Sequence, residues 1–201
     1  MVYCGVDFDE KFYNQAGAPD FSRAEWYDVK ESLGYDFPNL PYFQDGEMKI
    51  TESGAIMRYI AAKWKPELLH VNDPVYYAKV EMMSGIVADL KSATTMPCYT
   101  GAMSRDQLTQ MVIEKSKPIV AWMEKHGKHY IAGAELSFVD FIYFELLELQ
   151  DFATEGKLFT TYPMLKAYSE RIKNLPKLKE YYESDACMKR PFNNTVAKLN
   201  N

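Results

Sequence analysis

The segment from Asp36 to Trp64 constrains the fold of this chain more than any other, because it predicts a strand, a tight turn, a second strand and a helix in succession. Asp45-Gly46 is a strong signal for a short hairpin turn, since glycine adopts positive φ without steric cost. Pro41 cannot donate a hydrogen bond to a neighbouring strand, so the beginning of the first strand has to face something else. The helix is predicted from apolar residues at helical spacing, namely Ala55, Ile56, Tyr59 and Ile60.

Ser53 stands at the position expected for the N-cap of this helix. The free amides of the first turn, the positive end of the helix dipole and a hydroxyl group would then meet at one place. Such a place favours a carboxylate, and the sequence therefore indicates an anion site here. A capped helix packed on a hairpin, with no ligand, is the structural alternative.

A second group of candidate binding residues follows a loop. Ser22 is predicted to cap a short helix, with Glu25 completing a capping box. This helix carries Arg23, Trp26 and Lys30 over two turns. An indole N–H and two cations near an anion site favour ligand binding, although Trp26 alone could equally be a core or lid aromatic.

The composition excludes several classes of function. The chain has 201 residues and a net charge of −5, and its longest basic cluster is Lys189-Arg190, which argues against a nucleic-acid surface. No apolar run reaches the length of a membrane span, and the first residues lack the pattern of a signal peptide. The three cysteines are odd in number and far apart, which indicates a reduced cytosolic compartment. The three histidines show no ligand spacing, so we expect no metal site.

Two domains and a linker are predicted along the chain. Residues 65–74 are assigned as the linker because two prolines interrupt the periodicity and no apolar face is present. Residues 1–64 then form the first domain and residues 75–201 an all-helical second one. Helices are predicted over residues 75–93, 106–126, 138–149, 163–174 and 175–183.

Shorter signals refine this outline. Val6 to Phe12 alternate between apolar and polar residues, which predicts a short strand at the start of the chain. Pro97 is the predicted end of the first long helix, and Pro118 should kink the second. Ser137 and Asp140 have the spacing of a capping box at a helix start.

Several of these strings together resemble one protein family. Asn39-Leu40-Pro41, followed by Glu52-Ser53 at a helix start, is similar to the glutathione-binding motif of the soluble glutathione transferases. Over essentially the full length the chain resembles the mu class of that family. The strings that carry this resemblance are Ala18 to Trp26, Leu33 to Tyr42, Cys98-Tyr99 and Phe138 to Phe141. The resemblance implies an α/β thioredoxin-like N-terminal domain and an all-α C-terminal domain.

The resemblance also assigns roles in binding glutathione, the co-substrate, with no other cofactor. Arg23, Trp26 and Lys30 would bind its glycyl carboxylate. Asn39 and Leu40, before a cis Pro41, would offer their backbone, and Glu52 and Ser53 would hold the γ-glutamyl end. Glu52 stands where mu enzymes usually have Gln, but an acid can also accept a hydrogen bond from the ligand's ammonium group.

Three further roles involve a partner subunit or a second substrate. Asp89 of one subunit would reach the γ-glutamyl amine bound to the other. Phe37 matches an aromatic residue that this class inserts into the neighbouring subunit. Tyr99 would face the hydrophobic electrophile.

The N-terminus departs from the family pattern. The family begins with a strand and a helix, and the tyrosine that activates the thiol lies at the end of that strand. Residues 1–8 align with the end of that helix and the second strand, so roughly 17 residues, about one βα unit, are expected to be missing. Tyr3 does not align with the catalytic tyrosine, and the catalytic residue is therefore unknown. A thiol with a pKa near 8.5 needs about 2.7 kcal/mol of thiolate stabilisation for a two-unit decrease.

Two functions stay open at this stage. The first is a cytoplasmic, homodimeric glutathione transferase that conjugates reduced glutathione to hydrophobic electrophiles in detoxification. The second is a dimeric glutathione-binding or interaction protein with little or no catalysis. The sequence does not identify the electrophile.

Overall fold

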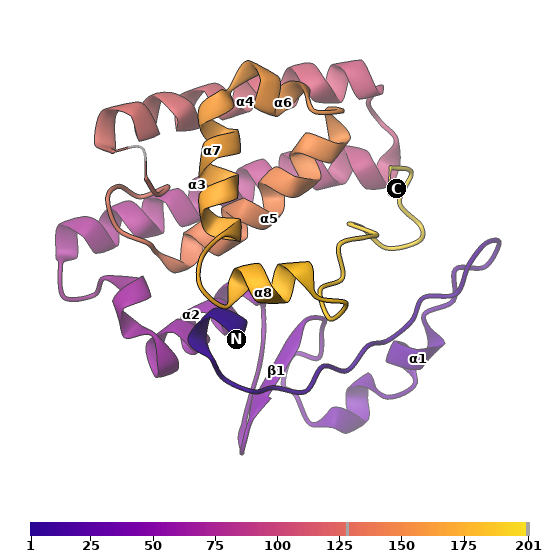
Figure 1. The fold of residues 1–201 in the computed structure, drawn as a ribbon. Helices are drawn as coiled ribbons and strands as arrows, with labels where there is room; N and C mark the ends of the chain where they lie inside the picture. Colours follow the sequence, from indigo (N-terminus) through magenta and orange to yellow (C-terminus); the bar gives the residue numbers. More distant parts are fainter. Residues whose placement is uncertain (128, 200–201) are drawn as a thin grey trace.

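The computed structural model describes residues 1–127 and 129–199. Its N-terminal part, in the lower half of Figure 1, consists of a β-hairpin and short helical segments. In chain order these are η1 (Val2–Cys4), α1 (Ala24–Tyr27), η2 (Lys30–Leu33), β1 (Tyr42–Asp45), β2 (Met48–Thr51) and α2 (Ser53–Trp64).

The hairpin forms as predicted. Strands β1 and β2 are antiparallel, and a two-residue turn with Gly46 at φ 60° joins them. Tyr42 pairs with Thr51, so the beginning of β1 lies beside the end of β2. Helix α2 packs on this hairpin, and Tyr59 donates a hydrogen bond to Asp45 (2.8 Å).

The strand predicted from Val6 to Phe12 is wrong. The described residues contain a single sheet of two strands, and residues 6–17 have no regular structure. In Figure 1 this segment runs past the hairpin toward α1. Phe8 and Phe12 are 40% and 60% exposed, so no buried face holds the alternating pattern in a sheet register.

The C-terminal part is all-helical, as predicted. Its elements are η3 (Pro66–Leu69), α3 (Pro74–Thr100), α4 (Arg105–His126), α5 (Phe138–Ala153), α6 (Lys157–Thr161), α7 (Pro163–Lys173) and α8 (Leu178–Glu183). The assignment of residues 65–74 as a linker stays a prediction.

Helix α3 does not end at Pro97, as the sequence predicted, but continues to Thr100. A proline inside a helix removes one backbone hydrogen bond, but α3 continues for three residues beyond Pro97. Pro97 and Cys98 are both buried. The helix ends at Gly101, which has a φ of 67° and whose N–H donates to the Pro97 carbonyl.

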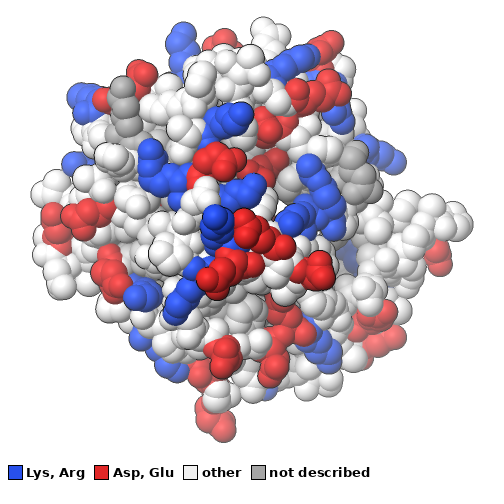
Figure 2. All heavy atoms as spheres, in the orientation of Figure 1, with Lys and Arg blue, Asp and Glu red and all other residues white. Residues whose placement is uncertain are grey.

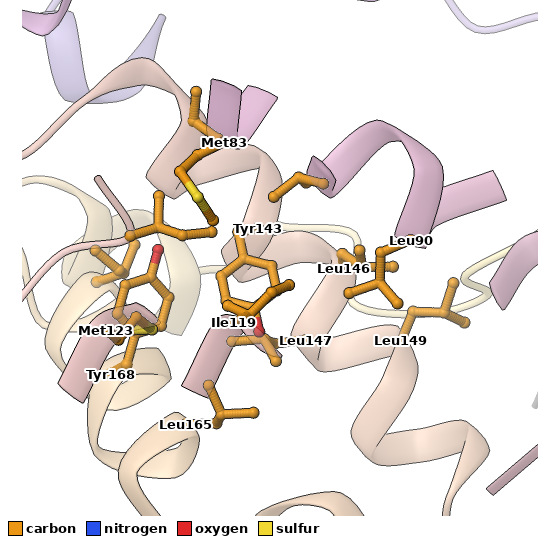
Figure 3. Packing of buried hydrophobic residues seen from close by; sticks show 14 of the residues in the cluster. Met83, Leu90, Ile119, Met123, Tyr143, Leu146, Leu147, Leu149, Leu165 and Tyr168 are labelled. Atoms are coloured by element: carbon orange, nitrogen blue, oxygen red, sulfur yellow. The ribbon is translucent and has the colours of Figure 1, made fainter. Parts of the chain in front are cut away.

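The core of the helical part lies between α3, α4, α5 and α7 (Figure 3). Tyr143 and Tyr168 are its largest fully buried side chains, and their ring centroids lie 5.5 Å apart. Aliphatic and methionine side chains pack around them, among them Met83, Ile119, Met123, Leu146, Leu147 and Leu165.

The predicted capping box at the start of α5 is present and extends into a larger network. The fully buried Asp140 carboxylate accepts hydrogen bonds from the Ser137 N–H (2.7 Å) and hydroxyl (2.7 Å). It also accepts from the Ile131 N–H (2.8 Å) and the Tyr168 hydroxyl (2.8 Å). Burial raises the pKa of Asp140, and these hydrogen bonds oppose that shift.

The two parts of the molecule are joined at several places, among them the contacts of η1 with α8 and of α2 with α5. Arg58 of α2 donates to both carboxylate oxygens of Glu81 on α3, at 3.2 and 2.6 Å. The C-terminal segment returns to the N-terminal part, where the Thr195 hydroxyl contacts Gln15 Oε1 (3.2 Å) and the Ala16 carbonyl (3.3 Å). These contacts set where the hairpin lies relative to α3.

Charged side chains of both signs are intermixed on the face drawn in Figure 2. Among the described residues, no helix combines the length and the apolar character needed to cross a membrane.

Candidate functional site

The hairpin brings the two halves of the predicted glutathione motif together. Tyr42 pairs with Thr51. Pro41 directly precedes Tyr42 and Glu52 directly follows Thr51, so Pro41 and Glu52 lie at the same end of the sheet. The Leu40–Pro41 peptide bond is cis, as the resemblance implied. The Thr51 hydroxyl also donates to the Phe37 carbonyl (2.9 Å), which ties the preceding loop to β2.

Ser53 lies one position further into the helix than the sequence predicted. Glu52 is the N-cap of α2, with φ 68° and ψ 109°, and Ser53 is the first helical residue. The prediction of Ser53 as the N-cap is therefore wrong, because the chain turns sharply at Glu52 as it leaves β2. Both side chains are exposed beside the positive end of the α2 dipole. The site keeps its preference for a carboxylate, with the Ser53 hydroxyl within the first turn.

Asn39 and Leu40 are exposed, and the Asn39 side chain is hydrogen-bonded to the main chain of Leu40. Its Oδ1 accepts the Leu40 N–H at 2.9 Å. The resemblance assigns the Leu40 backbone to glutathione. A ligand that takes this amide has to displace the Asn39 side chain.

Of the three candidates near α1, Trp26 is buried, Arg23 is exposed and Lys30 is half-buried. Trp26 is 8% exposed. Arg23 is exposed and forms the N-cap of α1. Lys30 pairs with Glu31 (3.2 Å), and its ammonium lies 5.3 Å from the Tyr27 ring centroid.

The capping box predicted from Ser22 and Glu25 does not form. Ser22 Oγ accepts the Ala24 N–H (3.2 Å), but the Glu25 carboxylate turns away to accept the Asn14 N–H (2.8 Å). The helix begins one residue later than predicted, with Arg23 as its N-cap, so Ser22 and Glu25 do not occupy the two positions of a capping box.

Aromatic residues that sequence reasoning did not select surround Trp26. The Tyr42 ring stacks on the indole (6.1 Å, 18°), and the Tyr13 ring meets it edge-on (5.1 Å). Tyr35 packs against Tyr42 (5.0 Å). We call Tyr13, Trp26, Tyr35 and Tyr42 the aromatic cluster. The position of Tyr42 directly after Pro41 was the one available signal in the sequence.

Tyr99 lies on α3, half-buried, next to the C-terminal segment. Its hydroxyl oxygen accepts the Asn194 N–H at 3.1 Å. With this lone pair engaged, the hydroxyl keeps its proton to donate to another group. The same segment reaches Gln15 through Thr195, so it connects Tyr99 to the loop that precedes α1.

Phe37 and Asp89, predicted to act across a subunit interface, are both exposed. Phe37 is 81% exposed, the largest fraction among the exposed apolar side chains of the described residues. Asp89 projects from α3. Met82, Ile86 and Asp89 have the spacing of one helix face.

An apolar cavity of about 300 Å³ lies elsewhere, between η1, α2, α5 and α8. Met57, Phe138 and Leu178 are among its lining residues, and the residues predicted to bind glutathione are not. The candidate site at the hairpin end is instead an open surface.

The chain thus has a hairpin with Pro41 at its entry, the start of α2 beside it and an adjoining helical part. This is the arrangement expected of two-domain transferases with a thioredoxin-like first domain. The N-terminal domain model of the glutathione S-transferase family matches residues 1–62, and the C-terminal domain model matches residues 89–185. This chain belongs to the glutathione S-transferase family.

Individual relatives and solved structures agree with this assignment. Glutathione S-transferase Mu 5 of Rattus norvegicus is 34% identical over 203 residues, which cover 100% of this chain and 88% of the relative. A glutathione S-transferase of Dermatophagoides pteronyssinus is 35% identical over 203 residues, covering 100% and 89%. The crystal structure of the glutathione S-transferase Blo t 8 superimposes with a TM-score of 0.78 at 28% identity, over 89% of this chain and 84% of that one.

Proposed function

We propose that this protein binds reduced glutathione at the hairpin end and conjugates it, through its thiol sulfur, to hydrophobic electrophiles in the cytoplasm. The observation that carries the proposal is the pairing of Tyr42 with Thr51, which holds cis-Pro41 beside Glu52 and Ser53. A tripeptide with two carboxylates and an ammonium group suits backbone groups, a helix start and an acidic side chain.

Each end of glutathione has candidate partners in this arrangement. The γ-glutamyl carboxylate meets the start of α2 and the Ser53 hydroxyl, while Glu52 accepts hydrogen bonds from the ammonium group. The glycyl carboxylate is oriented by the Trp26 indole and attracted by Arg23 and Lys30. These residues bind without contacting the sulfur, so affinity and thiol activation are separable.

In the proposed reaction the thiol first gives its proton to a base or to solvent, and the thiolate sulfur then forms a C–S bond with the electrophilic carbon. In a substitution the leaving group departs from that carbon with its electron pair, and in an addition the π electrons of the electrophile move to a neighbouring atom, which takes up a proton. Tyr99 can donate its hydroxyl proton to charge that develops on the electrophile, since its oxygen is oriented by Asn194. Glutathione is the co-substrate, and we propose no further cofactor. The transferase relatives support this activity over the alternative of a binding protein without catalysis.

We also propose that the protein acts as a homodimer. An apolar stripe along α3 is formed by exposed residues at helical spacing, namely Val75, Met82 and Ile86. Phe37 projects from the other domain and needs an apolar pocket, which the helical part of a second copy can supply. Asp89 continues the α3 stripe. A partner subunit placed on this face would therefore have the ammonium group of its bound glutathione near Asp89 of the first subunit.

Replacing Ser53 with alanine is expected to weaken glutathione binding about 10-fold or more, because a hydrogen bond to a charged group contributes about 1.5–3 kcal/mol. Isothermal titration calorimetry measures the affinity, and a chromogenic electrophile reports turnover. Ser32→Ala is the matched control, since that hydroxyl bonds to the Val29 carbonyl within η2. If the unaltered protein shows no heat of glutathione binding and no conjugation, the proposed function is wrong.

A further inference from the structure

Helix α1 is too short to be stabilised by its own hydrogen bonds. It is four residues long, and Trp26 is its one buried residue. A helix this short is not stable without tertiary contacts. The position of α1 therefore depends on its tertiary contacts, which are the hydrogen bonds from Asn14 to Glu25 and the packing of the Trp26 side chain.

The Trp26 indole is held between two tyrosine rings from distant parts of the chain. Tyr42 comes from the start of β1 and Tyr13 from the irregular N-terminal segment. The stacked and edge-on contacts at 6.1 and 5.1 Å are both favourable aromatic geometries. Together they define the plane of the indole.

The two tyrosine hydroxyl groups are joined to each other. Tyr13 Oη and Tyr42 Oη lie 3.1 Å apart in a hydrogen bond. Burial and this hydrogen bond raise the pKa of Tyr42 to about 12, so its hydroxyl stays neutral near pH 7. The segment that contains Tyr13 forms no strand with the hairpin, so no ladder of backbone hydrogen bonds joins the two. The hydrogen bond between the Tyr13 and Tyr42 side chains joins them instead.

We propose that Tyr13 is a positioning residue for glutathione binding, acting through its hydrogen bond to Tyr42 and its ring contact with Trp26. The bond fixes the Tyr13 ring, and the ring fixes the indole and with it α1. This inference rests on the proposed function, in which Trp26 orients the glycyl carboxylate. The Tyr13 hydroxyl itself does not contact the reacting atoms, so its effect falls on affinity and not on the chemical step.

The hydrogen bond can be tested by removing either hydroxyl group or both. Tyr13→Phe is expected to raise the KM and Kd for glutathione about 3- to 10-fold, because it frees the Tyr13 ring to move and leaves the part-buried Tyr42 hydroxyl without its partner. The kcat and the KM for the electrophile should not change. Tyr42→Phe removes the same bond from the other side. The double variant should bind no more weakly than either single one, since no orphaned hydroxyl is left.

Tyr27→Phe is the matched control, because Tyr27 also lies on α1 but is exposed and outside the aromatic cluster. Its glutathione affinity should equal that of the parent. Losses that add up in the double variant, or an unchanged Kd in both single variants, would overturn the inference.

A readout without ligand separates this inference from the proposed function. Replacing Trp64 and Trp122 with phenylalanine leaves Trp26 as the single tryptophan. In that background, Tyr13→Phe should shift Trp26 emission to longer wavelength and increase its quenching by acrylamide. If this occurs but the parent does not bind glutathione, the proposed function fails and the positioning of Trp26 stands. If emission and quenching are unchanged, Tyr13 does not position the indole.

Discussion

Replacing Asp140 with alanine is expected to lower the free energy of unfolding by at least about 4 kcal/mol, because four buried donors lose their acceptor and each costs about 1–3 kcal/mol. The donors are two backbone N–H groups and two hydroxyls, of Ile131, Ser137 and Tyr168. Urea denaturation followed by circular dichroism measures the loss. One protein concentration should be used, since association adds to apparent stability.

Two further variants make the Asp140 result specific. Asp140→Asn keeps the shape but places an amide N–H₂ toward groups that already donate, so we expect a smaller loss that is still more than about 1 kcal/mol. Glu145→Ala removes an acid from the exposed face of the same helix, where it pairs with Lys91 at 3.7 Å. This control should change stability by less than about 0.5 kcal/mol. An alanine variant at position 140 as stable as this control would refute the role of the network.

Phe37→Ser is expected to convert the proposed dimer largely to monomers. Burial of one phenylalanine contributes about 2–3 kcal/mol, and a two-fold interface contains two copies. The dissociation constant should therefore rise about 10³- to 10⁴-fold. Sedimentation velocity over a range of concentrations measures this shift.

The loop should keep its conformation in the Phe37→Ser variant, because Thr51 bonds to the main-chain carbonyl of residue 37 and not to its side chain. Phe12→Ser is the control, since Phe12 is also exposed, at 60%, but lies in the N-terminal segment. It should dimerise like the parent. A Phe37→Ser protein that dimerises as tightly as the Phe12→Ser protein would show that this loop is not part of the interface.

Short-range signals in the sequence were sufficient for the hairpin and for the start of α5. Asp45-Gly46 indicates a tight turn, and the hairpin does form there, although Asp45 pairs with Met48 and the two turn residues are Gly46 and Glu47. Ser137 and Asp140 are three residues apart, so their reciprocal bonds need no distant partner. The family motif around Pro41 and Glu52-Ser53 could be recognised for the same reason, since its two pieces are joined by a local hairpin.

Tertiary structure decided the features that depend on distant neighbours. Val6 to Phe12 has the alternation of a strand but no buried face, and α3 continues past Pro97, where Pro97 and Cys98 are both buried. The aromatic cluster unites Tyr13, Trp26 and Tyr42 from three separate segments, and no spacing along the chain could indicate it. Local sequence thus determined the hairpin, the start of α5 and the binding motif. Packing between segments decided which side chains hold that motif in place, because contacts between distant residues form only when the whole chain is folded.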